Sequence, residues 1–241
     1  TLMMSLVIWL IALPLFAWRA TDHREPALHV GEQPTAFNRA AFQAIRFSPA
    51  FMALLLSNLL IGAVDEAMST HLVVFLDRGV KLGAELAAIG FSLVMVMSNI
   101  GKIGFGWLIE RFGARGAAAC WMIAAVGVML ALPIGGLASF ILFAIVYGPT
   151  QGGFLVNIPV LSKQMFEPAA MIRSIAVLTT AYNIGAAIGP AMTGYMFDMT
   201  GSYRAPFFLL SGFAVLAALL MLAARSAASR QVDLRLSPTA P

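Results

Sequence analysis

The chain has 241 residues, of which 60% are hydrophobic and only 11% are charged, and its mean hydropathy is +0.87. Soluble domains carry about 25% charged residues, so this composition excludes a soluble globular protein and indicates an integral membrane protein. The net charge of +4 comes from basic residues spread between apolar runs, which argues against a nucleic-acid partner. The single cysteine, Cys120, excludes an internal disulfide framework and a cysteine-based metal cluster.

A membrane-spanning helix needs about 20 mostly apolar residues. Seven segments of the chain meet this condition: 2–18, 50–76, 86–109, 117–134, 137–161, 172–196 and 205–224. The chain starts with Thr1 and enters an apolar run at once, so we identify no signal peptide and expect a fragment of a longer protein. The predicted organisation is a transmembrane helix over 1–18, a cytoplasmic linker over 19–49, a six-helix bundle over 50–225 and a cytoplasmic tail over 226–241.

The distribution of basic residues orients the predicted spans, because cytoplasmic loops carry an excess of lysine and arginine. If the long linker is cytoplasmic, eleven basic residues fall on the cytoplasmic side and three on the outer side. The outer three are Arg78, Lys81 and Arg204. Lys102 is the one basic residue in neither set, and it lies within the third span, about 12 Å from its cytoplasmic end at 1.5 Å per residue.

Charged side chains at membrane depth usually face protein or water and mark functional positions. Lys102 either binds an anion in a central cavity, or pairs with a buried acid or extends to the boundary. By helical spacing it shares a face with Ser98, Asn99 and Gly106. We therefore expect it to face inward, while Ile100, Ile103 and Trp107 suit lipid or packing.

Two acids, Asp65 and Glu66, occupy the middle of the second span. Either could carry a proton, because burial disfavours a charged carboxylate, or could pair with Arg78 or Lys81 near the outer rim. Asp65 shares its face with small and polar residues: Asn58, Gly62 and Ser69. Four further polar side chains either line a cavity or form interhelical hydrogen bonds: Tyr147, Gln151, Tyr182 and Asn183.

The chain contains no GxxxxGK[ST], HExxH or GxSxG motif and only three histidines. The stretch Gly101-Lys-Ile-Gly-Phe-Gly106 superficially resembles a glycine-rich loop, but it lies inside a predicted membrane helix. We therefore expect no enzymatic activity, no cofactor and no metal site.

The stretch Gly106-Trp-Leu-Ile-Glu-Arg-Phe-Gly-Ala-Arg115 resembles the signature G-x-L-a-D-R-x-G-R of major facilitator superfamily transporters. Gly106, Arg111 and Gly113 match in place. Glu110 replaces the usual aspartate, and Arg115 follows one position after the usual arginine. In that family the motif joins helices 2 and 3 and recurs between helices 8 and 9, so the resemblance implies that the seven spans are helices 6 to 12.

This resemblance implies an all-α integral membrane fold, the C-terminal six-helix bundle of a major facilitator transporter plus one preceding helix. It also implies a missing N-terminal half as the partner of this bundle, and a cytoplasmic gate formed by the motif residues. We expect Gly106 to permit close helix packing there, and Glu110 and Arg111 to pair across helices.

Within the superfamily the chain is most similar to monocarboxylate transporter-like and oxalate/formate antiporter-like members. Residues 71–79 resemble the outer end of their helix 7, and residues 189–203 resemble their helix 11 and the following loop. Those families often place a basic residue that binds substrate carboxylate four positions before the motif glycine, where this chain has Lys102. Ser98 stands where some members have an acid, and the helix 11 segment lacks the second central cation of oxalate-type members, which favours a singly charged anion.

The expected function is secondary active transport of a small organic anion, coupled to a proton or to a counter-anion. Lys102 would bind the carboxylate, and Tyr147, Gln151 and Asn183 would shape the cavity. The alternatives are a major facilitator transporter of a drug, a sugar or a phosphorylated compound, and a non-transporting membrane receptor or structural partner. The expected location is the lipid bilayer of the cell membrane, which is the inner membrane in a Gram-negative bacterium.

Overall fold

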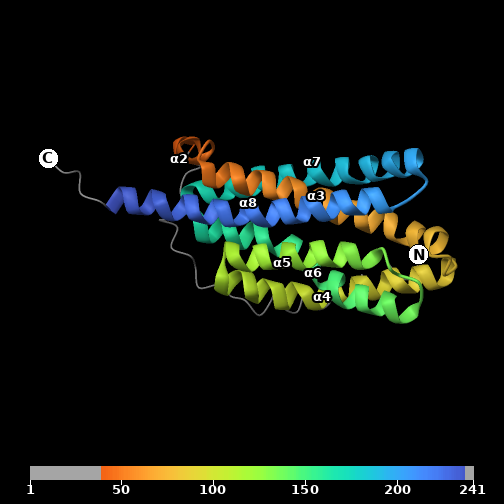
Figure 1. Ribbon diagram of the computed structural model, residues 1–241. Helices are drawn as coiled ribbons and strands as arrows, with labels where there is room; N and C mark the ends of the chain where they lie inside the picture. Colours follow the sequence, from red (N-terminus) through yellow and green to blue (C-terminus); the bar gives the residue numbers. More distant parts are fainter. Residues whose placement is uncertain (1–38, 237–241) are drawn as a thin grey trace, which may run out of the picture. The chain divides into compact units, whose positions relative to one another are not determined.

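The computed structural model describes residues 39–236, and every regular element in that part of the chain is helical. A short helix, α2 (Arg39–Ile45), precedes six long ones (Figure 1). The long helices are α3 (Pro49–Val74), α4 (Ala84–Phe112), α5 (Ala114–Ala131), α6 (Leu137–Met165), α7 (Pro168–Thr200) and α8 (Arg204–Leu236). A π-helical turn, η1 (Phe75–Gly79), continues α3. Each long helix is apolar enough over 18 residues or more to cross a membrane.

Six of the seven predicted spans correspond to these six helices, and the seventh, residues 2–18, lies outside the described residues. The observed helices run a few residues beyond the predicted spans at most ends. The largest extension is at the C-terminus, where α8 continues to Leu236 through part of the segment expected as a tail. The predicted linker, residues 19–49, lies mostly outside the described part, and its described end holds α2.

Local sequence explains where several helices begin and end. The side chain of Ser48 accepts a hydrogen bond from the Phe51 backbone N–H at 3.2 Å, and Pro49 occupies the first turn of α3. Proline likewise opens α7 at Pro168. The turn between α4 and α5 is a single residue, Gly113, with φ of 58° and ψ of −134°, a conformation that residues with a side chain rarely adopt.

Helices distant in the sequence form the main contacts of the bundle. The helix α3 packs chiefly against α7 and α8, α4 packs against α6, and α5 packs against α8 and α6. One hydrogen-bonded chain ties α5, α3 and α8 together: the indole N–H of Trp121 donates to the Ser57 hydroxyl at 3.2 Å, and that hydroxyl donates to the Ala217 carbonyl at 2.9 Å. Trp121 and Ser57 are fully buried, so these bonds fix the centre of the core.

Glycines bring two helix pairs into backbone contact. Where α4 crosses α6, a Cβ at Gly101 would overlap the backbone of Pro149, and one at Gly152 would overlap the backbone of α4 around Lys102. Where α3 crosses α7, a Cβ at Gly185 would overlap the Leu59 carbonyl. Small residues at crossings are the usual means of close helix approach in membranes.

The helices differ in how much of their surface the bundle covers. Only 28% of the residues in the most apolar stretch of α4 are buried, and only 22% in α7, against 39–61% in the other four long helices. The helices α4 and α7 are therefore the two that the bundle covers least, and their uncovered faces can meet lipid, water or another protein.

Candidate functional site

The polar groups at membrane depth divide between the surface and the interior of the bundle. Lys102, Glu66 and Asn183 are exposed, on α4, α3 and α7 respectively. Asp65 and Gln151 are buried, with 9% and 5% of their surface exposed, and Tyr147 is completely buried. All six residues lie within the predicted spans. The first three lie on the surface of the bundle and the other three lie in its interior.

Lys102 lies on a polar strip of the exposed face of α4. Its ammonium group donates to Asn99 Oδ1 at 3.0 Å, and the Asn99 amide donates to the Met95 carbonyl at 3.0 Å. An ammonium group has three N–H donors, so two are available to a ligand. Ser98 differs from the expectation: it is 7% exposed and turns into the bundle, because it belongs to the face of α4 that meets α6.

The apolar neighbours of Lys102 occupy the rest of the exposed surface of α4. Ile100, Ile103 and Trp107 are 57%, 79% and 59% exposed. Exposed aliphatic and aromatic side chains of this kind suit a lipid environment. The helix therefore presents Asn99 and Lys102 beside an apolar strip, and the expectation that Lys102 faces inward in the whole protein stays a prediction.

A buried cluster surrounds Asp65. The Tyr182 hydroxyl on α7 donates to Asp65 Oδ2, and the Gln151 side-chain amide on α6 donates to Asp65 Oδ1 at 3.2 Å. The same amide nitrogen of Gln151 donates to the Ser69 hydroxyl at 2.8 Å. One carboxylate thus connects α3, α6 and α7.

The acids do not pair with cations in the described part of the chain. Neither Asp65 nor Glu66 forms an ion pair with Lys102, Arg78 or Lys81 there. This removes, for these residues, the interpretation in which buried charges merely neutralise one another. Asp65 is held by the side chains of Gln151 and Tyr182. Lys102 bonds Asn99 and keeps two N–H groups for a ligand.

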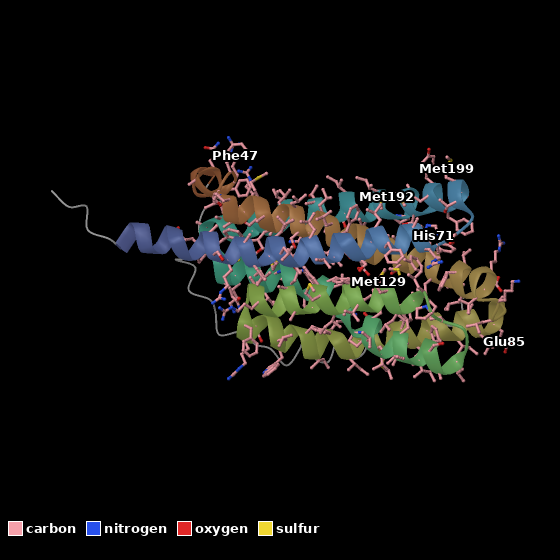
Figure 2. The ribbon with its side chains drawn as sticks, in the orientation of Figure 1. Phe47, His71, Glu85, Met129, Met192 and Met199 are labelled. Carbon is pink, nitrogen blue, oxygen red and sulfur yellow. The ribbon has the colours of Figure 1, made fainter. Side chains whose placement is uncertain are left out.

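His71 links α3 to α7 and to the turn before α8. Its Nε2 lies 3.0 Å from the Pro190 carbonyl oxygen and its Nδ1 lies 3.4 Å from the Tyr203 hydroxyl oxygen. A carbonyl can only accept, so the neutral tautomer with its proton on Nε2 satisfies both contacts. Burial raises the pKa of the Tyr203 hydroxyl. Figure 2 shows His71 at the end of the bundle where α3 ends and where Glu85, near the start of α4, projects outward.

The signature motif lies at the other end of α4. The hydrogen bond that ties it to α6 goes to a backbone carbonyl and not to a charged side chain. The side-chain amide of Gln164 on α6 donates to the Glu110 carbonyl oxygen at 2.8 Å. The guanidinium of Arg111 lies over the rings of Trp107 and Phe112, at 5.9 and 5.8 Å from their centroids.

Two expectations about this motif are wrong for the described residues. Glu110 and Arg111 form no ion pair there, and both are exposed, as is Arg115. Gly106 does not permit a close approach, since the nearest atom to a Cβ there would be Val156 Cγ2 at 3.9 Å. The close approach belongs to Gly101, because a Cβ there would overlap the backbone of α6 at Pro149, whereas Gly106 meets α6 only through the Val156 side chain at an ordinary distance.

Sequence reasoning missed Gln164 altogether. A glutamine near the end of a predicted span carries no motif, and its partner is 54 positions away. It named Tyr182 and Ser69 as polar residues, but no local pattern showed that Tyr182 bonds Asp65 or that Ser69 bonds Gln151.

Comparisons with known proteins agree with this geometry. The profile described as Major Facilitator Superfamily matches residues 81–238. Monocarboxylate transporter 12-B of Danio rerio is 29% identical over 213 residues, which cover 83% of this chain and 44% of that protein. Monocarboxylate transporter 12 of Homo sapiens is 28% identical over 180 residues, which cover 73% and 33%. Monocarboxylate transporter 11 of Homo sapiens is 25% identical over 187 residues, which cover 69% and 37%. The chain therefore spans less than half the length of these curated relatives.

Proposed function

Because this chain belongs to the Major Facilitator Superfamily, we propose that the full-length protein transports a small organic anion of the monocarboxylate type by alternating access. One observation carries the proposal: the ammonium group of Lys102 is exposed at membrane depth with two N–H donors left for a ligand. The similarity to proteins named monocarboxylate transporters supports the same choice of substrate class.

The residues divide into roles in this proposal. Lys102 binds the substrate carboxylate, and Asn183, exposed on α7, lines the same cavity. Tyr147 and Gln151 shape the site from behind, since both are buried. Asp65 and Glu66 couple transport to a proton or serve as charge partners; exchange for a counter-anion is the other coupling mode.

The motif at the end of α4 is the proposed cytoplasmic gate. Gly113 makes the tight turn into α5, and Glu110, Arg111 and Arg115 are exposed at that end. Exposed charges can form contacts in one state of the cycle that are absent in the other. Gly106 marks the start of the gate, without a packing role.

The proposed setting is the cell membrane, or the inner membrane of a Gram-negative cell. The N-terminal half of the same transporter would cover the exposed faces of α4 and α7 and complete the cavity. In this arrangement residues 1–18 form a preceding transmembrane helix, 19–49 form a cytoplasmic linker, 50–225 form the bundle and 226–241 form a cytoplasmic tail.

The test is uptake of a radiolabelled lactate-like acid by the full-length protein in proteoliposomes. Lys102→Ala should lower uptake by roughly 10- to 100-fold, the equivalent of a charged hydrogen bond of about 1.5–3 kcal/mol. Lys102→Arg should retain part of the activity, because it keeps the charge. Ile103→Ala, next in the chain and 79% exposed, is the matched control and should transport normally.

Normal uptake by a well-expressed Lys102→Ala variant would remove the substrate-binding role of Lys102. A panel of sugars, phosphorylated compounds and drugs in the same vesicles separates this proposal from other transported solutes. Binding of an acid without any movement across the vesicle membrane would indicate a receptor instead.

A further inference from the structure

The carboxylate of Asp65 lies buried in the centre of α3, and no cation of the described residues lies beside it. Among the described residues, the titratable groups that act on it are Glu66 on its own helix, Tyr147 on α6 and Tyr182 on α7. Glu66 carries a like charge, and the two tyrosines are neutral. A buried carboxylate without a counter-charge is costly, so the site needs a cation or a proton.

The other helices that pack against α3 supply no counter-charge. Between Arg204 and Arg225, α8 has no titratable side chain. On α4 the only charged side chain at membrane depth is that of Lys102, which bonds Asn99. Further along α3, His71 is engaged with Pro190 and the Tyr203 hydroxyl.

Two buried polar atoms next to Asp65 have no hydrogen-bond partner among the described residues. They are Gln151 Oε1 and the Tyr147 hydroxyl, on side chains that are 5% and 0% exposed. Tyr147 precedes Gln151 by one helical turn on α6, so both groups lie on the same face of that helix. Buried polar groups are nearly always paired in folded proteins, so these two atoms are available to a second arrangement of the cluster.

A half-turn of the Gln151 amide supplies that arrangement. In the structure, its nitrogen donates to Asp65 Oδ1 and to Ser69. After the half-turn, the amide oxygen takes the place of the nitrogen and accepts from the Ser69 hydroxyl and from a protonated Asp65. The amide nitrogen then faces the side of Tyr147. A neutral Asp65 would therefore find an acceptor where the ionised form finds a donor.

We propose that Asp65 is a reversible proton-binding site inside this bundle and that Gln151 is its positioning residue. The Gln151 amide presents its nitrogen to the ionised carboxylate and, after a half-turn, its oxygen to the protonated carboxyl group. Binding forms an O–H bond on Asp65 with a proton taken from water at the exposed side, where Glu66 stands, and leaves the carboxyl neutral. Release returns the same proton to water. The use of this proton in coupling rests on the proposed transport function, whereas its binding does not.

Proton binding changes the attachment of α7. A charged carboxylate makes hydrogen bonds roughly twice as strong as a neutral group does. The Tyr182 hydroxyl donates to Asp65 Oδ2, so the ionised form holds α7 firmly to α3. Protonation weakens this connection at the same time as it turns Gln151 on α6.

The test is infrared difference spectroscopy of the purified full-length protein titrated with acid, because the carboxyl C=O band appears only when the acid is protonated. Asp65→Asn, which keeps the size and the hydrogen-bonding groups, should lose one carboxyl band. Glu66→Gln is the matched control on the neighbouring residue and should keep the Asp65 band. Gln151→Leu should shift that band, because the neutral acid loses its acceptor.

A spectrum of folded Asp65→Asn that retains every carboxyl band would overturn the proposal. If that variant does not fold, Tyr182→Phe and Gln151→Leu decide: the Asp65 band must shift in both and stay in place in Glu66→Gln. An unshifted band in both variants rejects the site. The transport function fails separately, when the band titrates normally but no monocarboxylate crosses the vesicle membrane.

Discussion

A methyl group at Gly101 should separate α4 from α6. Its Cβ would overlap the carbonyl oxygen and the Cα of Pro149, whereas ordinary contacts start at 3.4 Å. Both sides of the contact are backbone, so no side chain can rotate away, and the helices must move apart by on the order of 1 Å. Gly104 is three residues further along the same helix, and a Cβ there would meet nothing within 4 Å.

The expected magnitude follows from two opposing effects. Overpacking in a tight core costs about 2–3 kcal/mol, and replacing a helical glycine by alanine returns about 1 kcal/mol. Gly101→Ala should therefore lower the free energy of unfolding by about 1–2 kcal/mol. Gly104→Ala has only the favourable effect and should leave stability unchanged or raise it by up to about 1 kcal/mol.

The assay is thermal unfolding of the purified full-length protein, followed by the loss of the monodisperse size-exclusion peak. Uptake measured well below the midpoint adds a functional readout, because the backbone of Lys102 lies against Gly152 at the same crossing. Gly101→Ala should unfold at lower temperature and transport more slowly than Gly104→Ala. Equal stability of the two variants would refute the close contact of α4 and α6.

Three further predictions concern the core and the end of the bundle near Tyr203. Trp121→Phe should destabilise the protein by about 2 kcal/mol through its lost bond to Ser57 and the gap left behind, whereas exposed Trp107→Phe should change stability by less than about 0.5 kcal/mol in the same unfolding assay. Cys120 is fully buried, so maleimide should label it only after unfolding; labelling of the folded protein beyond that of Cys120→Ser would contradict its burial. Since burial raises the pKa of Tyr203, the folded state keeps a proton that the unfolded chain releases, and stability should fall as pH rises above the ordinary value of 10.0. The unfolding midpoint of Tyr203→Phe should fall less steeply with pH, and parallel curves for the two proteins would speak against this.

The helices and the polar positions within them could be predicted from the sequence, because both depend on local composition and on helical periodicity. Lys102 and Asp65 stood out as charges in apolar runs, and the apolar strip of α4 followed from the 3.6-residue repeat, although Ser98 lies on the buried face instead of beside Lys102. The signature around Gly113 located the tight turn between α4 and α5.

The partners of these residues could not be predicted, because they come from distant parts of the chain. Asp65 is bonded to residues 86 and 117 positions away, and no local pattern encodes such a pairing. Gly101 and Gly106 are both glycines of α4 that lie near α6, but only Gly101 lies against the α6 backbone. The position of the helix crossing is set by the packing of the whole bundle.

The pairing of helices also shows that the bundle consists of two similar three-helix units, α3 to α5 and α6 to α8. Exchanging α3, α4 and α5 for α6, α7 and α8 leaves the pattern of packed pairs unchanged, since α3 with α7 becomes α6 with α4, and α5 with α8 maps onto itself. The two glycine crossings, at Gly101 and at Gly185, exchange in the same way. Each unit has three helices, an odd number, so the second unit crosses the bilayer in the opposite direction to the first. One chain thus contains two three-helix units with the same packing pattern and opposite orientations.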